Sequence, residues 1–313
     1  MKPQKLFLLV SFLLGVLHQG VHAKNVVIAT SSVTLTNVPI WVGIDKKLFE
    51  ESGLNVQYVV MRSDLAVKGL ITGDVDYMQS SSSVLRAGAA GAPVVVVFGT
   101  FNRTFFELVA WPEIKSLSDL KGKVIGISRY GASTEYAVRF GLRANKIDPD
   151  RDVKLLAVGG EEGRLTALHS RLVAASVLQV PTNFMAHKLG ARTILPLGEY
   201  LETLLAGLGI SRSKIEQNRD EVKRVIRSLV KSIDYMNGHR FEVIEIIQKR
   251  FGGIDRNIAE YIYGLVSKHA TRDGIPSKRA LEDTLLGTLF EGKITNFDQL
   301  ADFSLAREIA AGK

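Results

Sequence analysis

Four consecutive serines, at residues 80–83, stand between a predicted strand at 75–78 and a predicted helix at 84–90. The start of a helix carries unpaired backbone N–H groups and the positive end of the helix dipole, and both attract anions. Serine hydroxyls add further hydrogen bonds. We therefore predict that Ser81, Ser82 and Ser83 bind an anionic ligand. The alternative is that one serine caps the helix and the others have no role.

A second candidate anion site is the segment GISRYGAS at residues 126–133, which follows a predicted strand and precedes a predicted helix. Its spacing is that of a phosphate-binding loop, but Ala132 stands where that motif requires lysine. ATP chemistry is therefore excluded, while the turn geometry remains. We predict that Ser133 and Thr134 bind a carboxylate or sulfonate here. A purely structural turn is the alternative.

Arginine and aromatic side chains are further candidates, and Arg103 and Arg129 each lie where a lobe turns. Arg103 and Arg129 could each donate paired hydrogen bonds to a planar anion. Trp41, Phe101 and Tyr130 could stack on the organic part of a ligand. The alternatives are surface positions for the arginines and a core position for the tryptophan.

The chain lacks the usual patterns of enzymes. It has no cysteine and no G-x-S-x-G motif, and His169, His187, His239 and His269 include no pair at metal-ligand spacing. We therefore predict that the protein is not an enzyme and uses neither metal nor cofactor.

Residues 1–23 have a basic start, an apolar run of about 12 residues and a Val-His-Ala end, which predicts a secretory signal peptide. The absence of cysteine excludes disulfides and a lipid anchor on cysteine. We expect a soluble, periplasmic protein. The net charge is +8, but basic residues are spread along the chain, which argues against nucleic-acid binding.

The hydrophobic patterns predict an α/β fold with two lobes around a cleft. Strands alternate with helices in two similar units, which predicts mostly parallel sheets with helices on both sides. After residue 211 only helical patterns follow, at 220–236, 241–251, 258–269 and 280–290, and these should pack on the first lobe. Strands are predicted at 26–30, 54–60, 75–78, 94–98, 105–110, 123–127, 153–158, 174–178 and 193–195.

The predicted domains are a signal peptide at 1–23, a first lobe of residues 24–101 plus 197–313, and a second lobe of residues 102–196. In parallel sheets ligands bind at the carboxyl ends of strands. The loops after the predicted strands at 26–30, 75–78 and 123–127 should lie at these strand ends. The first of these loops adds Ser32 and Asn37 to the candidate ligand-binding residues.

Four segments in order resemble the periplasmic solute-binding proteins of the nitrate, sulfonate, taurine and thiamine-pyrimidine type. They are PIWVGIDKKLFEESGLNV at 39–56, GLITGDVDY at 69–77, LSDLKGKVIG at 117–126 and VLQVP at 177–181. The resemblance covers most of residues 26–200. The chain departs from the family pattern at Gly43, at Lys47 and at residues 170–174.

The resemblance implies a class II periplasmic-binding-protein fold that feeds an ATP-driven importer. It also implies that the serine loop, the residues after Gly126 and the loop at 179–181 line the cleft, which adds Gln179 to the candidates. We predict a monomer that closes its lobes on a small organic anion and then docks on an inner-membrane permease. An enzyme or a sensor module on the same scaffold, such as a pyrimidine-precursor-related protein, is the alternative.

Overall fold

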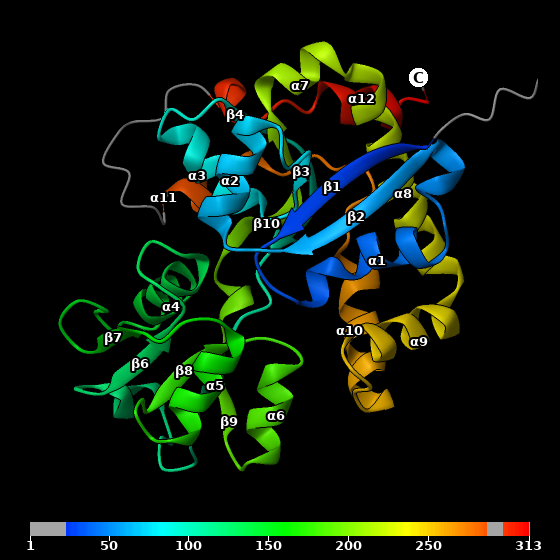
Figure 1. Ribbon diagram of the computed structural model, residues 1–313. Coiled ribbons are helices and arrows are strands. Elements are labelled where there is room, and N and C mark those ends of the chain that lie inside the picture. The colour runs from blue at the N-terminus through cyan, green and yellow to red at the C-terminus, as the bar shows by residue number, and fades with distance from the viewer. Residues whose placement is uncertain (1–22, 287–296, 313) are drawn as a thin grey trace, which may run out of the picture.

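The computed structural model describes residues 23–286 and 297–312, so all of the predicted signal peptide except Ala23 lies outside the described residues. The chain forms two α/β lobes, each built on a five-stranded sheet (Figure 1). We call the lobe that holds the first sheet lobe 1 and the lobe that holds the second sheet lobe 2. No helix in the described part of the chain is long and apolar enough to cross a membrane.

The sheet of lobe 1 has the strand order β2-β1-β3-β10-β4. Its strands are β1 (Lys24–Thr30), β2 (Leu54–Val60), β3 (Tyr77–Met78), β4 (Val94–Arg103) and β10 (Glu202–Ser211). Its covering helices are α1 (Val38–Asp45), α2 (Ser63–Thr72) and α3 (Ser81–Ala89). The first half of β4 is entirely buried, as its unbroken run of apolar residues predicts. Helix α3 begins before residue 84, so three of the four serines lie in its first turn.

The sheet of lobe 1 is mostly parallel, as predicted, but one antiparallel strand that was not predicted makes it mixed. Strand β10 runs antiparallel between β3 and β4, and the sequence analysis assigned no strand there. Its two glycines hide the strand pattern, because glycine has low strand propensity. The structure needs them: a Cβ on Gly207 would lie 1.9 Å from the Phe98 carbonyl oxygen, and one on Gly209 would lie 2.4 Å from the Val84 side chain. These glycines allow α3, which bears the serines, to pack closely on the sheet.

The sheet of lobe 2 has the strand order β7-β6-β8-β5-β9 and is also mixed. Strand β6 pairs in parallel with β7 and β8, whereas β5 pairs antiparallel with β8 and β9. Its strands are β5 (Glu107–Ala110), β6 (Val124–Ile127), β7 (Lys154–Ala157), β8 (Ala175–Leu178) and β9 (Arg192–Pro196). Its helices are α4 (Ser133–Ala144), α5 (Glu161–His169) and α6 (Thr182–Lys188). All five strands were predicted from the sequence.

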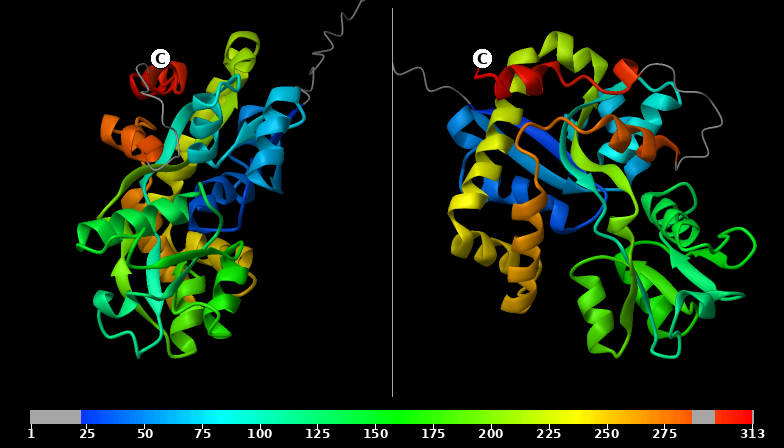
Figure 2. Two further views of the ribbon diagram at one scale, coloured as in Figure 1. Left: turned by 90° about the vertical axis from the view of Figure 1, so that its left-hand side faces the viewer. Right: turned by 180° about the vertical axis from the view of Figure 1, so that it is seen from behind.

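The helices after β10 pack mainly on lobe 1 (Figure 2), while Tyr261 of this segment also contacts Phe184 of lobe 2. They are α7 (Arg212–Gln217), α8 (Arg219–Gly238), α9 (Arg240–Arg250), α10 (Arg256–His269), α11 (Lys278–Leu286) and α12 (Ser304–Ala310). Residues 287–290 of the predicted last helix lie outside the described residues. Helices α7 and α12 were not predicted, because one or two turns give too little periodicity to detect. Short 3₁₀ turns lie at Leu35–Asn37, Glu50–Ser52, Leu117–Leu120, Leu197–Glu199 and Phe297–Gln299.

Two chain segments connect the lobes, one between β4 and β5 and one between β9 and β10. They lie side by side: a Cβ on Gly198 would be 2.3 Å from the Thr104 carbonyl oxygen. Arg103 Nη2 donates a hydrogen bond of 3.1 Å to the Gly198 carbonyl oxygen. Arg103 is therefore a residue of the interlobe connection.

Candidate functional site

A cleft of about 510 Å³ lies where the carboxyl ends of strands from both lobes face each other. That volume is in the range of small-molecule sites. From lobe 1 and the connecting segments the cleft is lined by Thr30, Ser31, Ser32, Thr34, Thr36, Arg62, Ser63, Asp64, Gln79, Ser80, Ser82, Ser83, Arg86, Phe106, Leu205 and Ala206. From lobe 2 it is lined by Ser128, Arg129, Ala132, Ser133, Thr134, Gly159, Gly160, Glu161, Arg164 and Gln179. Hydroxyl groups and arginines dominate this lining.

The first turn of α3 brings Ser82 and Ser83 to the cleft, while Ser81 is fully buried beneath them. The backbone N–H groups of Ser81 and Ser83 donate to the carbonyl oxygens of Gln79 and Ser80. These two amides are therefore not free for an anion, contrary to the expectation. The hydroxyls remain, and Ser80 Oγ lies 2.9 Å from Ser31 Oγ across the cleft wall.

Arg86 lies on the second turn of α3 and lines the cleft. Its Nη2 donates a hydrogen bond of 3.1 Å to Ser83 Oγ. Burial lowers the pKa of Arg86 to about 10; nearby Tyr136 raises it and Arg129 lowers it further. At neutral pH the guanidinium is still charged. No carboxylate among the described residues forms an ion pair with it, so lobe 1 presents a cation without a counter-charge.

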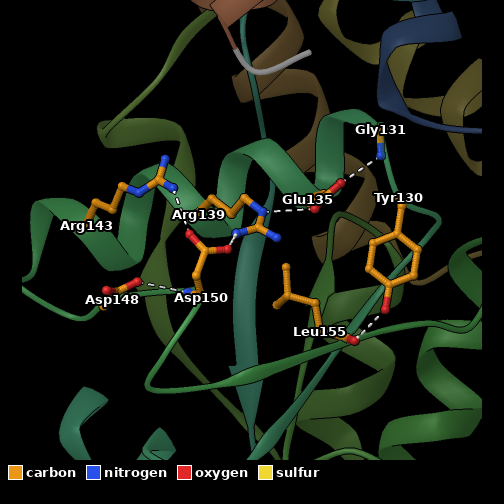
Figure 3. A network of polar contacts seen from close by, with 8 residues as sticks. All are labelled: Tyr130, Gly131, Glu135, Arg139, Arg143, Asp148, Asp150 and Leu155. Carbon is orange, nitrogen blue, oxygen red and sulfur yellow. Dashed lines mark hydrogen bonds and ion pairs between the residues drawn. The ribbon is translucent and has the colours of Figure 1, made fainter. Parts of the chain in front are cut away.

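On lobe 2, the loop between β6 and α4 is tied down at several points. Ser128 N donates to Thr134 Oγ1 at 3.0 Å. Figure 3 shows that Tyr130 OH donates to the Leu155 carbonyl oxygen at 2.7 Å and that Gly131 N donates to Glu135 Oε2 at 2.6 Å. Gly131 has φ +72°, which a side chain would strain.

Glu135 is itself held by a network on α4. Arg139 Nε donates to Glu135 Oε1 at 2.8 Å, and Arg139 and Arg143 both reach the carboxylate of Asp150 (Figure 3). The hydrogen bond from Arg139 lowers the pKa of Asp150. This network supports the loop that carries Arg129.

Arg129 lies between these tethered residues; it is exposed and lines the cleft. Within residues 23–286 and 297–312 it forms no hydrogen bond or ion pair. The cleft therefore has an uncompensated arginine on each lobe.

The third arginine of the site, Arg164 on α5, is different. It is only 3% exposed and forms an ion pair with Glu161. Its Nε donates to the Val177 carbonyl oxygen and its Nη1 to the Gly159 carbonyl oxygen, at 2.5 and 3.0 Å. Burial lowers the pKa of Arg164 and raises that of Glu161, and the attraction between the two opposes both shifts. Arg164 thus joins α5 to β8.

A neutral network holds the loop after β1. Gln79 Oε1 accepts hydrogen bonds from Tyr58 OH at 2.6 Å and from Asn37 Nδ2 at 2.8 Å. Asn37 Oδ1 accepts the backbone N–H of Thr34 at 2.5 Å. Asn37 is 1% exposed, so it supports the cleft wall from behind.

Seven of the predicted ligand-binding residues line the cleft, and six do not. The seven are Ser32, Ser82, Ser83, Arg129, Ser133, Thr134 and Gln179. The six are Asn37, Trp41, Ser81, Phe101, Arg103 and Tyr130, none of which is part of the lining.

The two aromatic residues Trp41 and Phe101 pack edge-to-face on Phe251 and Phe105, in a cluster of buried apolar residues. Apolar packing explains their position better than ligand stacking. Tyr130 is 55% exposed, but its hydroxyl is used within lobe 2.

Three arginines that line the cleft were not predicted, Arg62, Arg86 and Arg164, and the last two are the most informative for its chemistry. Arg86 stands three and four residues after Ser83 and Ser82, so helical spacing places it on their face. That spacing was the available signal. Arg164 stands three residues after Glu161, so helical spacing also indicates their ion pair, but the place of that pair at the cleft depends on β8 and the loop after β7. Among the described residues no group of three or more His, Asp or Glu could hold a metal ion.

Residues 36–241 match the model of the family described as NMT1/THI5 like. The chain is 21% identical, over 96% of its length and 95% of the other, to a Bacillus subtilis (strain 168) protein named "Putative binding protein YtlA". The periplasmic aliphatic sulphonate binding protein SsuA of Escherichia coli is similar in structure, with a TM-score of 0.65, 17% identity and coverage of 79% of this chain and 85% of SsuA. The periplasmic nitrate-binding protein NrtA of Synechocystis PCC 6803 has a TM-score of 0.74, 11% identity and coverage of 93% and 89%.

Proposed function

Because the chain belongs to the NMT1/THI5-like family, we propose that it is the solute-binding component of an ABC importer and captures a small anion between its lobes. The observation that carries this proposal is the pair of arginines, Arg86 and Arg129, that face the cleft without a carboxylate partner in the described residues. The partly buried Arg86 without a counter-charge costs free energy, which a bound anion recovers, and the exposed Arg129 adds a second positive charge at the cleft. The hydroxyls around them supply hydrogen bonds to its oxygens.

The two-lobed architecture supplies the capture step. A ligand that contacts both lobes at once stabilises the closed arrangement relative to the open one, so binding shifts the population toward closure. The two connecting segments near Gly198 and Thr104 are the places where the backbone must bend. We take lobe 1 as residues 24–101 with 197–313 and lobe 2 as residues 102–196 for this motion.

The compartment and the partner are part of the same proposal. A segment with the composition of a signal peptide precedes β1. SsuA and NrtA are named as periplasmic binding proteins for a sulphonate and for nitrate. We infer that this protein works in the periplasm as a monomer and delivers its ligand to a membrane permease.

The test is a thermal-unfolding titration of the purified protein with ethanesulfonate, acetate, benzoate and nitrate, with 1-propanol and benzamide as uncharged controls. A ligand at one hundred times its Kd should add about 2.7 kcal/mol of stability. Stabilisation by an anion but not by the controls supports the proposal. If no anion raises the unfolding temperature, the proposal is wrong.

An enzyme on the same scaffold would behave differently. Ligand recovered after prolonged incubation should be chemically unchanged if the protein only binds and releases it. Mass spectrometry of the recovered ligand measures this directly, and turnover would contradict a transport role.

A further inference from the structure

The charged residues around the cleft restrict the class of ligand more than the volume of the cleft does. Four arginines and two carboxylates line it. Arg62 pairs with Asp64 at 3.0 Å, and Arg164 pairs with Glu161. The two carboxylates are thus both used by neighbours. Arg86 and Arg129 remain, and the lining has an excess of two positive charges.

We propose that the ligand is a small dianion, in which one negative charge lies at Arg86 on lobe 1 and the other at Arg129 on lobe 2. This inference rests on the proposed function and specifies the substrate class of the same cleft. A single negative charge would neutralise one guanidinium and leave the other uncompensated beside it.

The guanidinium of Arg86 has few hydrogen-bond acceptors around it, so a bound anion would supply both acceptors and a counter-charge. Its one hydrogen bond to the described residues is to Ser83 Oγ. A guanidinium has five N–H donors, so most remain for a ligand. Next to it, Tyr136 is 92% buried, and its OH group has no hydrogen-bond partner in the described part of the chain. Arg86 and Tyr136 both line a small hollow beside the cleft, as do Ser82 and Ser133. Asp283 also lines this hollow, but its carboxylate pairs with Arg279 at 3.4 Å and forms no ion pair with Arg86.

Arg129 is presented to the cleft by a rigid loop. Its neighbours on the C-terminal side, Tyr130 and Gly131, are both tethered, to Leu155 and Glu135 (Figure 3). A fixed backbone reduces the entropy that is lost when the side chain is ordered on a ligand. Arg129 and Arg86 line the same cleft, and burial lowers the pKa of Arg86 while the charge of Arg129 lowers it further, so the two cations repel each other across the cleft. Bringing the lobes together increases that repulsion, unless a dianion lies between them.

The test compares ligands that differ in one charge and little else. Methyl phosphate at pH 7.5 is mostly a dianion, since its second pKa is about 6, and methyl sulfate is its monoanionic analogue. 3-Sulfopropanoate is a dianion with separated charges, and 3-sulfopropanamide is its monoanionic analogue. Affinities are measured by calorimetry at two salt concentrations. The first pair tests two charges on one group, and the second tests two charges on two groups.

We expect the dianion of at least one pair to bind at least tenfold more tightly than its monoanionic analogue. In Arg129→Gln, the affinity for the dianion should fall more than the affinity for its monoanionic analogue, so that the preference falls to threefold or less. Arg151→Gln is the matched control, because Arg151 is also an exposed arginine of lobe 2 but does not line the cleft. The unfolding temperature without ligand checks that each variant is folded.

If the monoanions bind as tightly as their dianionic analogues, or if Arg129→Gln retains the full preference, the dianion proposal is wrong and anion import still stands. If none of the four probes or the simple anions binds, both proposals are wrong.

Discussion

Each wall of the cleft contains an arginine near the start of a helix. In the described residues the arginine of lobe 2 has a carboxylate partner, and the arginine of lobe 1 has none. Arg164 on α5 has a carboxylate, Glu161, and two backbone carbonyl oxygens as partners. Arg86 on α3 has one serine hydroxyl. Arg164 therefore stabilises the wall of lobe 2, whereas Arg86 carries an electrostatic cost in the wall of lobe 1. The number of arginines in a cleft therefore does not predict anion binding by itself, because only arginines without a carboxylate partner have a charge available for a ligand.

The largest effect should come from breaking the paired arginine. Glu161→Gln leaves the buried Arg164 without its carboxylate, and loss of one partner of a buried pair costs about 3 kcal/mol. Urea unfolding measures the change. Glu162→Gln is the control, since that neighbouring carboxylate is exposed. Equal stability of the two variants would show that Arg164 does not depend on Glu161.

The unpaired arginine should respond in the opposite way. Arg86→Met removes a charge that has no counter-charge in the described residues, so stability without ligand should stay the same or rise. Anion affinity should fall by about 100-fold, because the lost interaction is charge-assisted. Calorimetry and thermal unfolding measure the two quantities. Arg212→Met, an exposed arginine of lobe 1 outside the cleft, should change neither. A destabilised Arg86→Met with unaltered affinity would make Arg86 a structural residue like Arg164.

The neutral network behind the wall of lobe 1 should have an intermediate effect. Asn37→Ala removes the amide that joins the Thr34 backbone to Gln79, and buried polar groups left without partners cost about 2 kcal/mol. Anion affinity should fall less than tenfold, because Asn37 does not line the cleft. Asn55→Ala, an exposed asparagine hydrogen-bonded to Asn25, should cost much less. A larger loss of affinity than of stability would place Asn37 among the ligand-binding residues after all.

The smallest effect concerns the network that supports the loop of Arg129. Asp150→Asn should cost about 0.5 kcal/mol at neutral pH, because the side chain is 58% exposed and solvent screens its ion pairs. The pKa of Asp150 is lower in the folded state than in the unfolded state, mainly through the hydrogen bond from Arg139. Its contribution is therefore present above about pH 4 and is lost as the pH falls through the folded-state pKa.

Urea unfolding of the wild type and Asp150→Asn between pH 2.5 and pH 7 tests this, and the two stabilities should converge at the acid end. A constant difference across that range would mean that the ionised carboxylate of Asp150 contributes nothing.

Much of the fold could be predicted from particular sequence patterns. The apolar run at 94–98 predicted a buried strand, and that run forms the first half of β4. The helical pattern at 220–236 lies within α8. Strand β10 could not be predicted, because Gly207 and Gly209 interrupt its strand pattern. These glycines are required by the close packing of β10 against β4 and α3. That reason depends on neighbours more than 100 residues away in the chain.

The candidate site was predicted in part. Residue type and position after a strand predicted that Ser82, Ser83 and Arg129 lie at the cleft, and all three line it. The same reasoning placed Trp41 and Phe101 there, but both are in the apolar core. Aromatic side chains suit a core and a ligand equally well, and only the positions of the surrounding helices separate the two. Arg103 was selected for its place at a lobe boundary, and the structure uses that place for the interlobe connection.

The sequence by itself determined the alternation of strands and helices, the two lobes and the polar loops at the strand ends, because these depend on local periodicity and on the turn residues between elements. Only the tertiary structure decided which arginines are buried and which of their charges face the cleft. Spacing along the chain allows the ion pair between Glu161 and Arg164, which are three residues apart on α5, but the carbonyl partner of Arg164 on β8 and the lack of a carboxylate partner for Arg86 in the described residues depend on elements far apart in the chain.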